Sequence, residues 1–307
     1  MMINYRNKLK TALSLIQTPR RLILPAGQNG LLKFIPDELY LKMVFEAEMG
    51  YTLDLQHPIT YNEKIQWIKI HDRKDVYTLY ADKYKVRDYI ANEIGEKYLI
   101  PLLGVYKKAS DIVWEKLPNR FVLKCNHSSG SNIICLNKKE LDTKSTSKQL
   151  DIWLHNNAFW GGREWCYKNI EPCIICEEFL GTEDGATPND YKIMCFNGTP
   201  KLIQVHQDRY GNHTLDFMDM NWKKTRIVQG PPNSPEGTPK PDVFDEMIEI
   251  AKVLSRNTFY SRIDLYVVGN SVKFGEITMY PTSGLCPFDD PKTDIILGNW
   301  IKLPIDY

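Results

Sequence analysis

The chain has 307 residues, a length that fits one large domain or two ordinary domains, because domains usually contain about 100 to 200 residues. Hydrophobic residues make up 43% of the chain and charged residues 25%, a composition that excludes a fibrous or wholly disordered protein. The 39 Lys and Arg against 38 Asp and Glu give a net charge of +1, which disfavours a nucleic-acid-binding protein that relies on overall basicity and still permits a local basic cleft.

Residues 1–25 combine five basic residues and no acidic residue with apolar residues at helical spacing, among them Leu9, Leu13 and Ile16. This pattern predicts a helix that either lies on an anionic membrane surface or packs on its own domain, and both alternatives stay open. No apolar run reaches the roughly 18 to 20 residues that span a bilayer, and the N-terminus has no apolar core typical of a signal peptide. We therefore expect a cytoplasmic protein, with residues 1–25 as its membrane contact in the first alternative.

The following stretch, residues 31–95, is predicted to be helical. Pro36 begins one helix, and Thr60 with Glu63 forms a capping box for the next. Apolar residues at every fourth position, Val86 and Ile90 among them, indicate a further helix. We expect a basic helical segment over 1–55 and a second, mainly helical region over 56–120.

From residue 98 onward the sequence changes to short β-type runs separated by Gly, Asn and Pro turns. Strands are expected at 121–125, 133–136, 174–180, 191–196, 202–205, 263–268 and 272–277, with helices at 145–159 and after residue 241. The stretch 229–241 holds five prolines in 13 positions and predicts an irregular connection. This order of elements indicates an α+β fold with mainly antiparallel sheets.

The seven cysteines are scattered singly and odd in number, which favours free thiols in a reducing compartment over a disulfide framework. Only Cys173 and Cys176 have the spacing of a metal or redox site. They fall in a predicted strand, where residues three apart point to opposite faces and cannot share one metal.

Lys124 is the first candidate for chemistry, because it lies within the apolar run 121–125 and is followed by a short polar loop, Ser128, Ser129, Gly130 and Ser131. Such a loop can bring backbone N–H groups and hydroxyls against phosphate oxygens. An ordinary hairpin with a lysine that extends to solvent is the alternative. The chain lacks the familiar phosphate-loop and dinucleotide-binding motifs and those of zinc and serine hydrolases.

A second group of charged residues lies near the C-terminus. Strand alternation places Arg262 and Asp264 on one face of a strand, and Glu276 and Thr278 on one face of its hairpin partner. Lys192 is also embedded in a predicted strand. Buried charges of this kind are costly unless they hold a hard cation and a phosphate, whereas an exposed edge hairpin would carry them without function.

Taken in order, these residues resemble the ATP-grasp fold, and more closely its TupA-like branch, which is associated with bacterial surface polysaccharides. The branch is suggested by the segments 61–67, 81–83, 163–172 and 275–281, and the resemblance covers about residues 55–304. It implies two α+β subdomains that clasp ATP, with an ATP-grasp domain over 121–307 divided into subdomains 121–180 and 181–307.

The resemblance also implies roles for individual residues. Lys124 and Lys83 would contact the ATP phosphates, and Ser128, Ser129, Gly130 and Ser131 would close over them. Glu177, Glu178, Phe179 and Leu180 would hold adenine, and Glu183 or Asp184 the ribose. Lys192 and Arg262 would neutralise phosphoryl charge as catalytic residues, and Asp264, Glu276 and Thr278 would carry Mg²⁺, although the superfamily usually has Asn at the last position.

The activity implied is ligation of a carboxylate to an amine through an acyl phosphate, with ATP and Mg²⁺ as cofactors. The polysaccharide association further implies a free or lipid-linked sugar acid as acceptor, with amide formation at its uronic-acid carboxyl by an amine donor. Residues that could contact these substrates are Arg163, Lys168, His206, Asp208, Arg209 and Ser283. Structural roles are the alternative for the histidines, and solvated charges beside Trp160 and Trp165 for Arg163 and Lys168.

Three other functions remain open at this point. A glycosyltransferase would need residues 216–221 as its metal motif, although they do not form a DxD. A kinase of the same fold would stop after phosphoryl transfer to a hydroxyl, and a non-catalytic nucleotide-binding scaffold would bind ATP without turnover. No nucleic-acid partner is expected.

Overall fold

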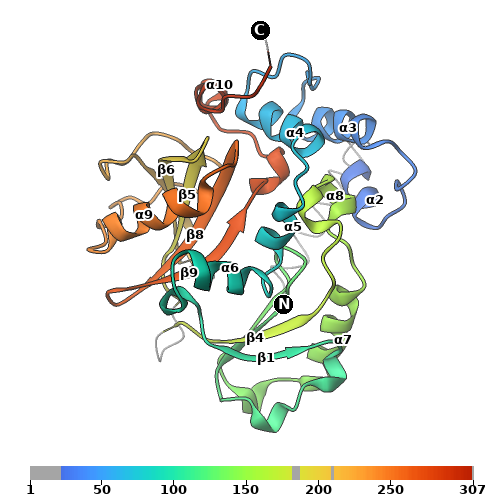
Figure 1. The fold of residues 1–307 in the computed structure, drawn as a ribbon, viewed down its shortest axis with the longest axis vertical. Coiled ribbons are helices and arrows are strands. Elements are labelled where there is room, and N and C mark those ends of the chain that lie inside the picture. Colours follow the sequence, from blue (N-terminus) through green and yellow to red (C-terminus); the bar gives the residue numbers. More distant parts are fainter. Residues whose placement is uncertain (1–21, 182–186, 209–210, 306–307) are drawn as a thin grey trace.

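The computed structural model describes residues 22–181, 187–208 and 211–305 and has two antiparallel β-sheets beside a helical N-terminal region (Figure 1). The predicted α+β class is confirmed. Residues Glu183, Asp184 and Arg209, and nearly all of the predicted helix in 1–25, lie outside the described residues.

The helical region begins with α2 and α3, which pack against each other, and continues through α4, α5 and α6. The predicted capping box is present, because Thr60 Oγ1 accepts a hydrogen bond from Glu63 N at 3.1 Å and Glu63 Oε2 accepts one from Thr60 N at 2.9 Å. Pro36 precedes α3, as expected. The bounds are α2 (Ile23–Gln28), α3 (Asp37–Met49), α4 (Tyr61–His71), α5 (Val76–Ala81) and α6 (Val86–Glu93).

Sheet A has four strands in the order β1-β4-β2-β3, namely β1 (Leu102–Tyr106), β4 (Ile174–Glu178), β2 (Phe121–Cys125) and β3 (Asn132–Cys135). Helix α7 (Thr143–Leu154) packs against the sheet through an apolar cluster that includes Leu123 and Leu150. Strand β1 was not predicted, because Gly104 interrupts a short run that has no apolar alternation. The first sheet therefore takes its edge strand from the region 56–120.

Sheet B has five strands in the order β7-β6-β5-β8-β9, namely β7 (Thr214–Met218), β6 (Thr199–Gln207), β5 (Asp190–Phe196), β8 (Tyr260–Val268) and β9 (Ser271–Thr278). Helix α9 (Phe244–Ser255) covers one face of it, as its apolar stripe predicts (Figure 1). The hairpin expected at Gly269 joins β8 to β9, with Gly269 at a φ of 58°. The other face of the sheet looks toward α5, η6 and sheet A.

Some connecting elements differ from the expectation. The helix predicted over 145–159 is α7 followed by a separate short helix, α8 (Phe159–Gly162), because Asp142 caps α7 earlier and the chain leaves helical geometry after Leu154. Strand β7 and helix α10 (Pro291–Trp300) were not predicted. The proline-rich stretch 229–241 is irregular, as expected.

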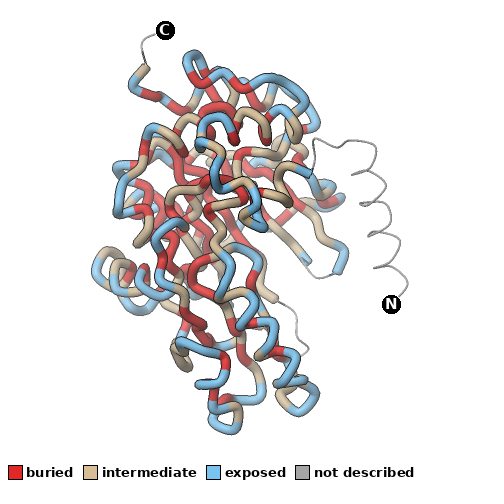
Figure 2. The backbone as a smooth tube through the Cα atoms, turned by 90° about the vertical axis from the view of Figure 1, so that its right-hand side faces the viewer, coloured by how far each residue is buried: buried red, intermediate tan, exposed pale blue. Residues whose placement is uncertain are grey.

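The short 3₁₀ helices are η2 (Glu96–Tyr98), η3 (Ala109–Asp111), η4 (Trp114–Lys116), η5 (Lys138–Glu140), η6 (Trp165–Tyr167) and η7 (Pro281–Gly284). Figure 2 shows that buried residues run through the interior of the molecule, with exposed residues at its periphery. The largest apolar cluster joins sheet B to α4, α5, α6 and α9. Sheet B and the helical region therefore share one core, which holds the sheet in place.

All seven cysteines are free thiols, as predicted. Among the described residues, no helix has the length and apolar character needed to cross a bilayer.

Candidate active site

Three charged side chains form a row across the middle of sheet B. The strand register pairs Lys192 on β5 with Asp264 on β8, and Asp264 with Glu276 on β9. Lys192 Nζ hydrogen-bonds to Asp264 Oδ2, and both residues are buried. Directly paired residues lie on the same face of a sheet, so the row presents two carboxylates and one ammonium on the face that looks toward sheet A.

A second row on the same face contains Arg262 and Thr278, which are also direct cross-strand partners. The Arg262 guanidinium binds both carboxylate oxygens of Asp264 at 2.7 Å and donates to Thr278 Oγ1 at 3.2 Å. Thr278 Oγ1 in turn donates to Glu276 Oε1 at 2.9 Å. The sequence-predicted pairing of these four residues on one face is confirmed.

Burial alone would raise the pKa of the Glu276 carboxyl, but the charges of Lys83, Lys192 and Arg262 lower it well below its usual range. Burial alone would lower the pKa of Arg262. The negative charge of Asp264 outweighs this effect, so the pKa of Arg262 is raised. Burial raises the pKa of Asp264, against the opposing charges of Arg262 and Lys192. Glu276 therefore stays ionised at neutral pH, in the form that a cation would bind.

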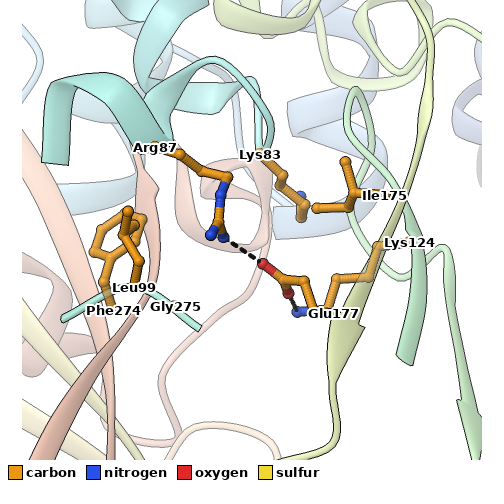
Figure 3. Close-up of a pocket in the computed structure, with 8 residues that line it drawn as sticks. All are labelled: Lys83, Arg87, Leu99, Lys124, Ile175, Glu177, Phe274 and Gly275. Carbon is orange, nitrogen blue, oxygen red and sulfur yellow. Dashed lines mark hydrogen bonds and ion pairs between the residues drawn. The ribbon is translucent and has the colours of Figure 1, made fainter. Parts of the chain in front are cut away.

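Sheet A carries charged side chains of its own, which Figure 3 shows in a pocket that Phe274 and Gly275 of β9 also line. The register Val122 with Glu177 and Lys124 with Ile175 puts Lys124 and Glu177 diagonally on one face of the sheet. Lys124 Nζ donates to Glu177 Oε2 at 2.7 Å, and Arg87 Nη1 donates to Glu177 Oε1 at 3.0 Å. Figure 3 shows Glu177 between the two cations in a small pocket that Phe274 and Gly275 of β9 close on the other side.

Lys83 links the two sheets. Its ammonium donates to the carbonyl of Ser128 at 2.8 Å and forms an ion pair with Glu276 Oε2 at 3.6 Å. In the loop itself, Ser128 and Ser131 share a hydrogen bond of 2.6 Å, whereas Ser129 and Gly130 are exposed at its tip. Lys83 therefore lies where the predicted phosphate loop meets the predicted metal residues.

The predicted adenine hinge begins at the end of β4. Glu177 points into the pocket, Glu178 is exposed, and the Phe179 ring lies 5.8 Å from the Arg120 guanidinium. Leu180 is half-buried, and the predicted ribose ligands Glu183 and Asp184 lie beyond the described residues. Of the four predicted hinge residues, Glu177 lines the same pocket as Lys124.

Sequence reasoning missed Arg87. It lies on α6, about 90 residues before its partner Glu177, and a solvent-exposed arginine on a helix gives the same sequence pattern. Its second nitrogen donates to the carbonyl of Ile100 at 2.7 Å, which fixes the guanidinium over the pocket.

The donor set can be tested for its fit to MgATP. Mg²⁺ in proteins is usually bound by one or two carboxylates together with substrate phosphates. Asp264 and Glu276 supply two carboxylates, while the described residues contain no group of three or more His, Cys, Asp or Glu that could hold a metal by itself. Five cations converge on the same space, namely Lys83, Arg87, Lys124, Lys192 and Arg262. The residues therefore fit a metal that arrives with a polyphosphate.

A further polar cluster lies beyond the end of β9, around Ser283. The buried Lys69 of α4 donates to Ser283 O at 2.6 Å and to Ser283 Oγ at 2.8 Å, and Gln66 Nε2 also donates to Ser283 O at 3.0 Å. These contacts hold a strained turn in which Thr282 and Ser283 have φ values of 48° and 58°. Neither Lys69 nor Glu164, which lies beside Ser283, was predicted as a site residue.

Several buried groups of this Ser283 cluster interact with Glu164. Burial raises the pKa of the Glu164 carboxyl, and the Lys69 ammonium opposes the rise. Among the described residues, the buried Tyr280 hydroxyl and the buried Trp165 indole N–H have no hydrogen-bond partner. An unpaired buried donor costs about 1 to 3 kcal/mol, so a polar partner for the Tyr280 hydroxyl would be favourable.

Lys69 should make stability depend on pH. Burial lowers the pKa of its ammonium to about 8, whereas the unfolded chain keeps a value of about 10.4. Between these values the unfolded state binds more protons, so the contribution of Lys69 to stability rises with pH. We expect the free energy of unfolding of the wild type, relative to Lys69→Met, to increase by about 2 kcal/mol between about pH 8 and pH 10. Urea unfolding of both proteins across this range measures it, and a constant difference would contradict it.

Arg163 is not a substrate ligand, and its prediction as one is corrected. Its side chain is fully buried, with Nη2 donating to Leu32 O at 2.8 Å, Nη1 to Trp160 O at 3.0 Å and Nε 3.1 Å from Asp37. Lys168 is exposed, with its ammonium 5.2 Å from the Trp165 ring and 4.9 Å from that of Phe159. Lys168 therefore fits the alternative that the sequence analysis left open, a solvated charge beside an aromatic ring.

The remaining predicted substrate residues lie at the end of β6. His206 Nδ1 is 2.9 Å from His213 Nε2, and the two rings stack. Asp208 adopts a φ of 47° and accepts a hydrogen bond from Asn212 N at 2.6 Å, so it organises a turn. His206 is the direct cross-strand partner of Asp190 on β5, and Asp190 Oδ2 lies 2.8 Å from Lys192 Nζ, so His206 lies next to the charged row on the same face of sheet B.

The segment 216–221 does not provide a metal motif. Asp216 is fully buried and is bound by Lys224 at 2.8 Å and by the Ser234 hydroxyl at 2.7 Å. Asp219 closes a turn by accepting hydrogen bonds from the N–H groups of Asn221 and Lys223. The glycosyltransferase alternative thereby loses the residues on which it depended.

Comparison with solved structures finds distant likeness. The D-alanine–D-alanine ligase of Bacillus anthracis is 16% identical, with 66% of this chain and 57% of that chain covered and a TM-score of 0.40. The L-amino acid ligase of Bacillus licheniformis is 11% identical over 89% of this chain and 64% of that chain, with a TM-score of 0.47. The ATP-grasp ligase PsnB, complexed with a minimal precursor, Mg and ADP, is 9% identical over 71% and 57%, with a TM-score of 0.38.

The chain thus spans 57% of the length of the first of these ligases. No curated protein sequence matches the chain significantly. The family model described as TupA-like ATPgrasp matches residues 63–302, a range that contains both charged rows, the Ser/Gly loop and the hinge. The chain has the ATP-grasp fold and belongs to the TupA-like ATP-grasp family.

Proposed function

We propose that the protein is an ATP-dependent ligase that joins a carboxylate to an amine through an acyl phosphate. The observation that carries this proposal is the convergence of five cations and the two carboxylates Asp264 and Glu276 between two sheets. Phosphoryl transfer depends on charge compensation and positioning far more than on a protein nucleophile. Membership of the family and the ligase names of the structural neighbours agree with this choice.

Bound MgATP would supply the phosphoryl group that activates the carboxylate. The residues of this chain then have separate tasks. Lys83 and Lys124 would bind phosphate oxygens, Arg262 and Lys192 would offset charge on the transferred group, and Asp264 with Glu276 would hold Mg²⁺. Glu177 accepts hydrogen bonds from both Lys124 and Arg87, so a phosphate bound by Lys124 would compete with this carboxylate.

The Ser283 cluster is our candidate for the acceptor end of the site. It follows β9 directly after the Glu276 and Thr278 row, and Glu164 is close enough to Glu276 for their charges to interact. The buried Tyr280 hydroxyl, which interacts electrostatically with Glu164, has no hydrogen-bond partner among the described residues, and a polar substrate could supply one. A substrate held here would lie next to the metal residues, as in-line transfer to its carboxylate requires.

For the acceptor we propose a uronic-acid carboxyl of a bacterial surface polysaccharide or of its precursor, and for the donor an amino acid or amine. This finer assignment rests on the family resemblance alone. A carboxylate oxygen would attack the γ-phosphorus with loss of ADP. The amine nitrogen would then attack the acyl carbon, lose its proton and release phosphate, so that each turnover yields one amide, ADP and phosphate.

Mass spectrometry of reaction mixtures tests this function. The protein is incubated with MgATP, glucuronic and galacturonic acids and a pool of amino acids. The proposal predicts a product heavier than the sugar acid by one amino acid minus water, formed together with ADP. A phosphorylated sugar with no amide would support the kinase, and nucleotide binding without any ADP would support the scaffold.

A further inference from the structure

Glu164, two residues after α8, is half-buried, and the cation that acts on its carboxylate most strongly is Lys69. The Lys69 ammonium is itself fully buried and donates its three hydrogens elsewhere, to Ser283 O at 2.6 Å, Ser283 Oγ at 2.8 Å and Gln66 Oε1 at 3.0 Å. No hydrogen of Lys69 is therefore left for Glu164. The carboxylate feels this positive charge only from a distance and keeps the capacity to bind a second cation.

The structure fixes the position of the Glu164 carboxylate. Ser283 Oγ accepts a hydrogen bond from Lys69, so its own hydrogen is free to donate to Glu164, with which it is hydrogen-bonded. A Cβ at Gly162 would lie 2.1 Å from Ser283 Oγ and 2.8 Å from Glu164 Oε1, so a glycine is needed where these two groups meet. Ser283 has a φ of 58°, and strained backbone of this kind is concentrated at functional sites.

Glu164 also lies near the charged rows of sheet B. Its charge interacts with that of Glu276, and the Tyr167 hydroxyl interacts with Glu164, Glu276 and Arg262 alike. Within the described part of the chain, no three acidic, histidine or cysteine residues are grouped so that they could hold a metal, so Glu164 is not a third carboxylate of the metal pair. The titratable groups that act on it are Lys69, Cys166, Tyr167, Glu276 and Tyr280.

We propose that Glu164 binds the ammonium group of the amine donor and accepts its proton when the amine attacks the acyl phosphate. This role rests on the proposed function. A primary amine is an ammonium ion at neutral pH, and its nitrogen can attack only after losing a proton, so a carboxylate beside the reacting carbon can first attract the donor and then act as its base. Lys69 and Ser283 are the positioning residues in this arrangement.

The proton transfers balance in the following way. One proton of the ammonium passes to Glu164, the freed lone pair forms the bond from nitrogen to the acyl carbon, and the bond from this carbon to the phosphate oxygen breaks with its electrons on that oxygen. A second proton from nitrogen leaves with the phosphate as hydrogen phosphate. Burial raises the pKa of the Glu164 carboxyl, which brings its basicity closer to that of the amine. Because Glu164 is only half-buried, it can then release its proton to water.

Binding of a small amine tests the first half of the proposal without any turnover. The full chain, with Mg²⁺ and a non-hydrolysable ATP analogue, is titrated with glycinamide, and saturation-transfer NMR measures binding. Glycolamide, in which a hydroxyl replaces the amino group, is the neutral comparison. We expect the wild type to bind glycinamide at least about tenfold more tightly than glycolamide, and Glu164→Gln to lose this preference. Glu249→Gln, which changes a 69% exposed carboxylate on α9, should keep it.

Trapping with hydroxylamine tests the second half. Hydroxylamine is largely unprotonated at neutral pH, so it captures an acyl phosphate without needing a base. With the acceptor that the mass spectrometry identifies, Glu164→Gln should form hydroxamate at close to the wild-type rate, whereas amide formation from glycinamide should fall about a hundredfold. This deficit should shrink as the pH rises, because more of the amine is then neutral. Thermal unfolding confirms that the variant is folded.

Equal loss of hydroxamate and amide in Glu164→Gln, or loss of neither, would overturn the role of Glu164. A wild type that does not prefer glycinamide to glycolamide would overturn it as well, and this comparison needs no variant. Absence of hydroxamate from the wild type contradicts the ligase proposal instead, and the two failures are therefore distinguished.

Discussion

Replacing Glu276 by Gln is expected to lower turnover about a thousandfold while the fold survives. Glu276 stands at the end of the row across sheet B, where Lys83, Lys192 and Arg262 keep its carboxyl ionised. Gln preserves the volume and can still accept the hydrogen bond from Thr278, so packing is nearly unchanged. The substitution removes one of the two carboxylates that would hold the metal. A thousandfold loss of turnover corresponds to about 4 kcal/mol in the activation free energy, at about 1.4 kcal/mol for each factor of ten.

The measurement is ADP release with the identified acceptor, or slow ATP hydrolysis without it, alongside thermal unfolding. Thr278→Ala is the matched control on the same strand and should cost much less, because a neutral hydroxyl contributes little to charge compensation. Near-wild-type turnover in a folded Glu276→Gln protein would show that this face of β9 does not hold the metal.

Replacing Arg163 by Met is expected to have the largest effect on stability, a loss of about 3 kcal/mol in the free energy of unfolding. The change leaves the carbonyls of Leu32 and Trp160 without their charged donor inside the protein. Asp37 keeps Arg73 as a partner at 2.8 Å, which places the loss at the lower end of the range for a broken buried ion pair.

Lys168→Met is the matched control, since it removes an exposed cation that lies over the Phe159 and Trp165 rings and should cost no more than about 1 kcal/mol. Urea unfolding measures both changes. Turnover per folded molecule of Arg163→Met should stay close to that of the wild type. An Arg163→Met protein of normal stability with a weakened acceptor KM would restore Arg163 to the substrate site.

Much of the candidate active site could be predicted because it depends on local rules. Strand alternation places Arg262 with Asp264, and Glu276 with Thr278, without knowledge of the fold. The capping box at Thr60 is equally local, because its two partners are three residues apart. Each of these predictions needs only the geometry of one strand pair or one helix turn, and the structure bears them out.

The residues that were missed depend on long-range packing. Lys69 reaches Ser283 across 214 positions and Arg87 reaches Glu177 across 90, and on a helix both give the same pattern as a solvent-exposed charge. For Arg163 the error was the reverse, since a buried structural residue was predicted to bind substrate. A charged residue beside tryptophans resembles a sugar-binding group, and its burial against Leu32 is visible only in three dimensions. The register that joins Lys192 to Asp264 likewise comes from pairing of strands about 70 residues apart.

Isothermal titration calorimetry of the wild type with a non-hydrolysable ATP analogue, with and without Mg²⁺, asks directly whether the space between the sheets is a nucleotide site. Lys124→Met in a second titration probes the pocket itself, since Glu177 keeps Arg87 as a partner and the sheet should remain folded. We expect Mg²⁺-dependent binding of the ATP analogue that Lys124→Met weakens at least about tenfold, and no comparable binding of UDP-glucuronic acid. Tight binding of UDP-glucuronic acid with no binding of the ATP analogue in the presence of Mg²⁺ would contradict the assignment of this cleft.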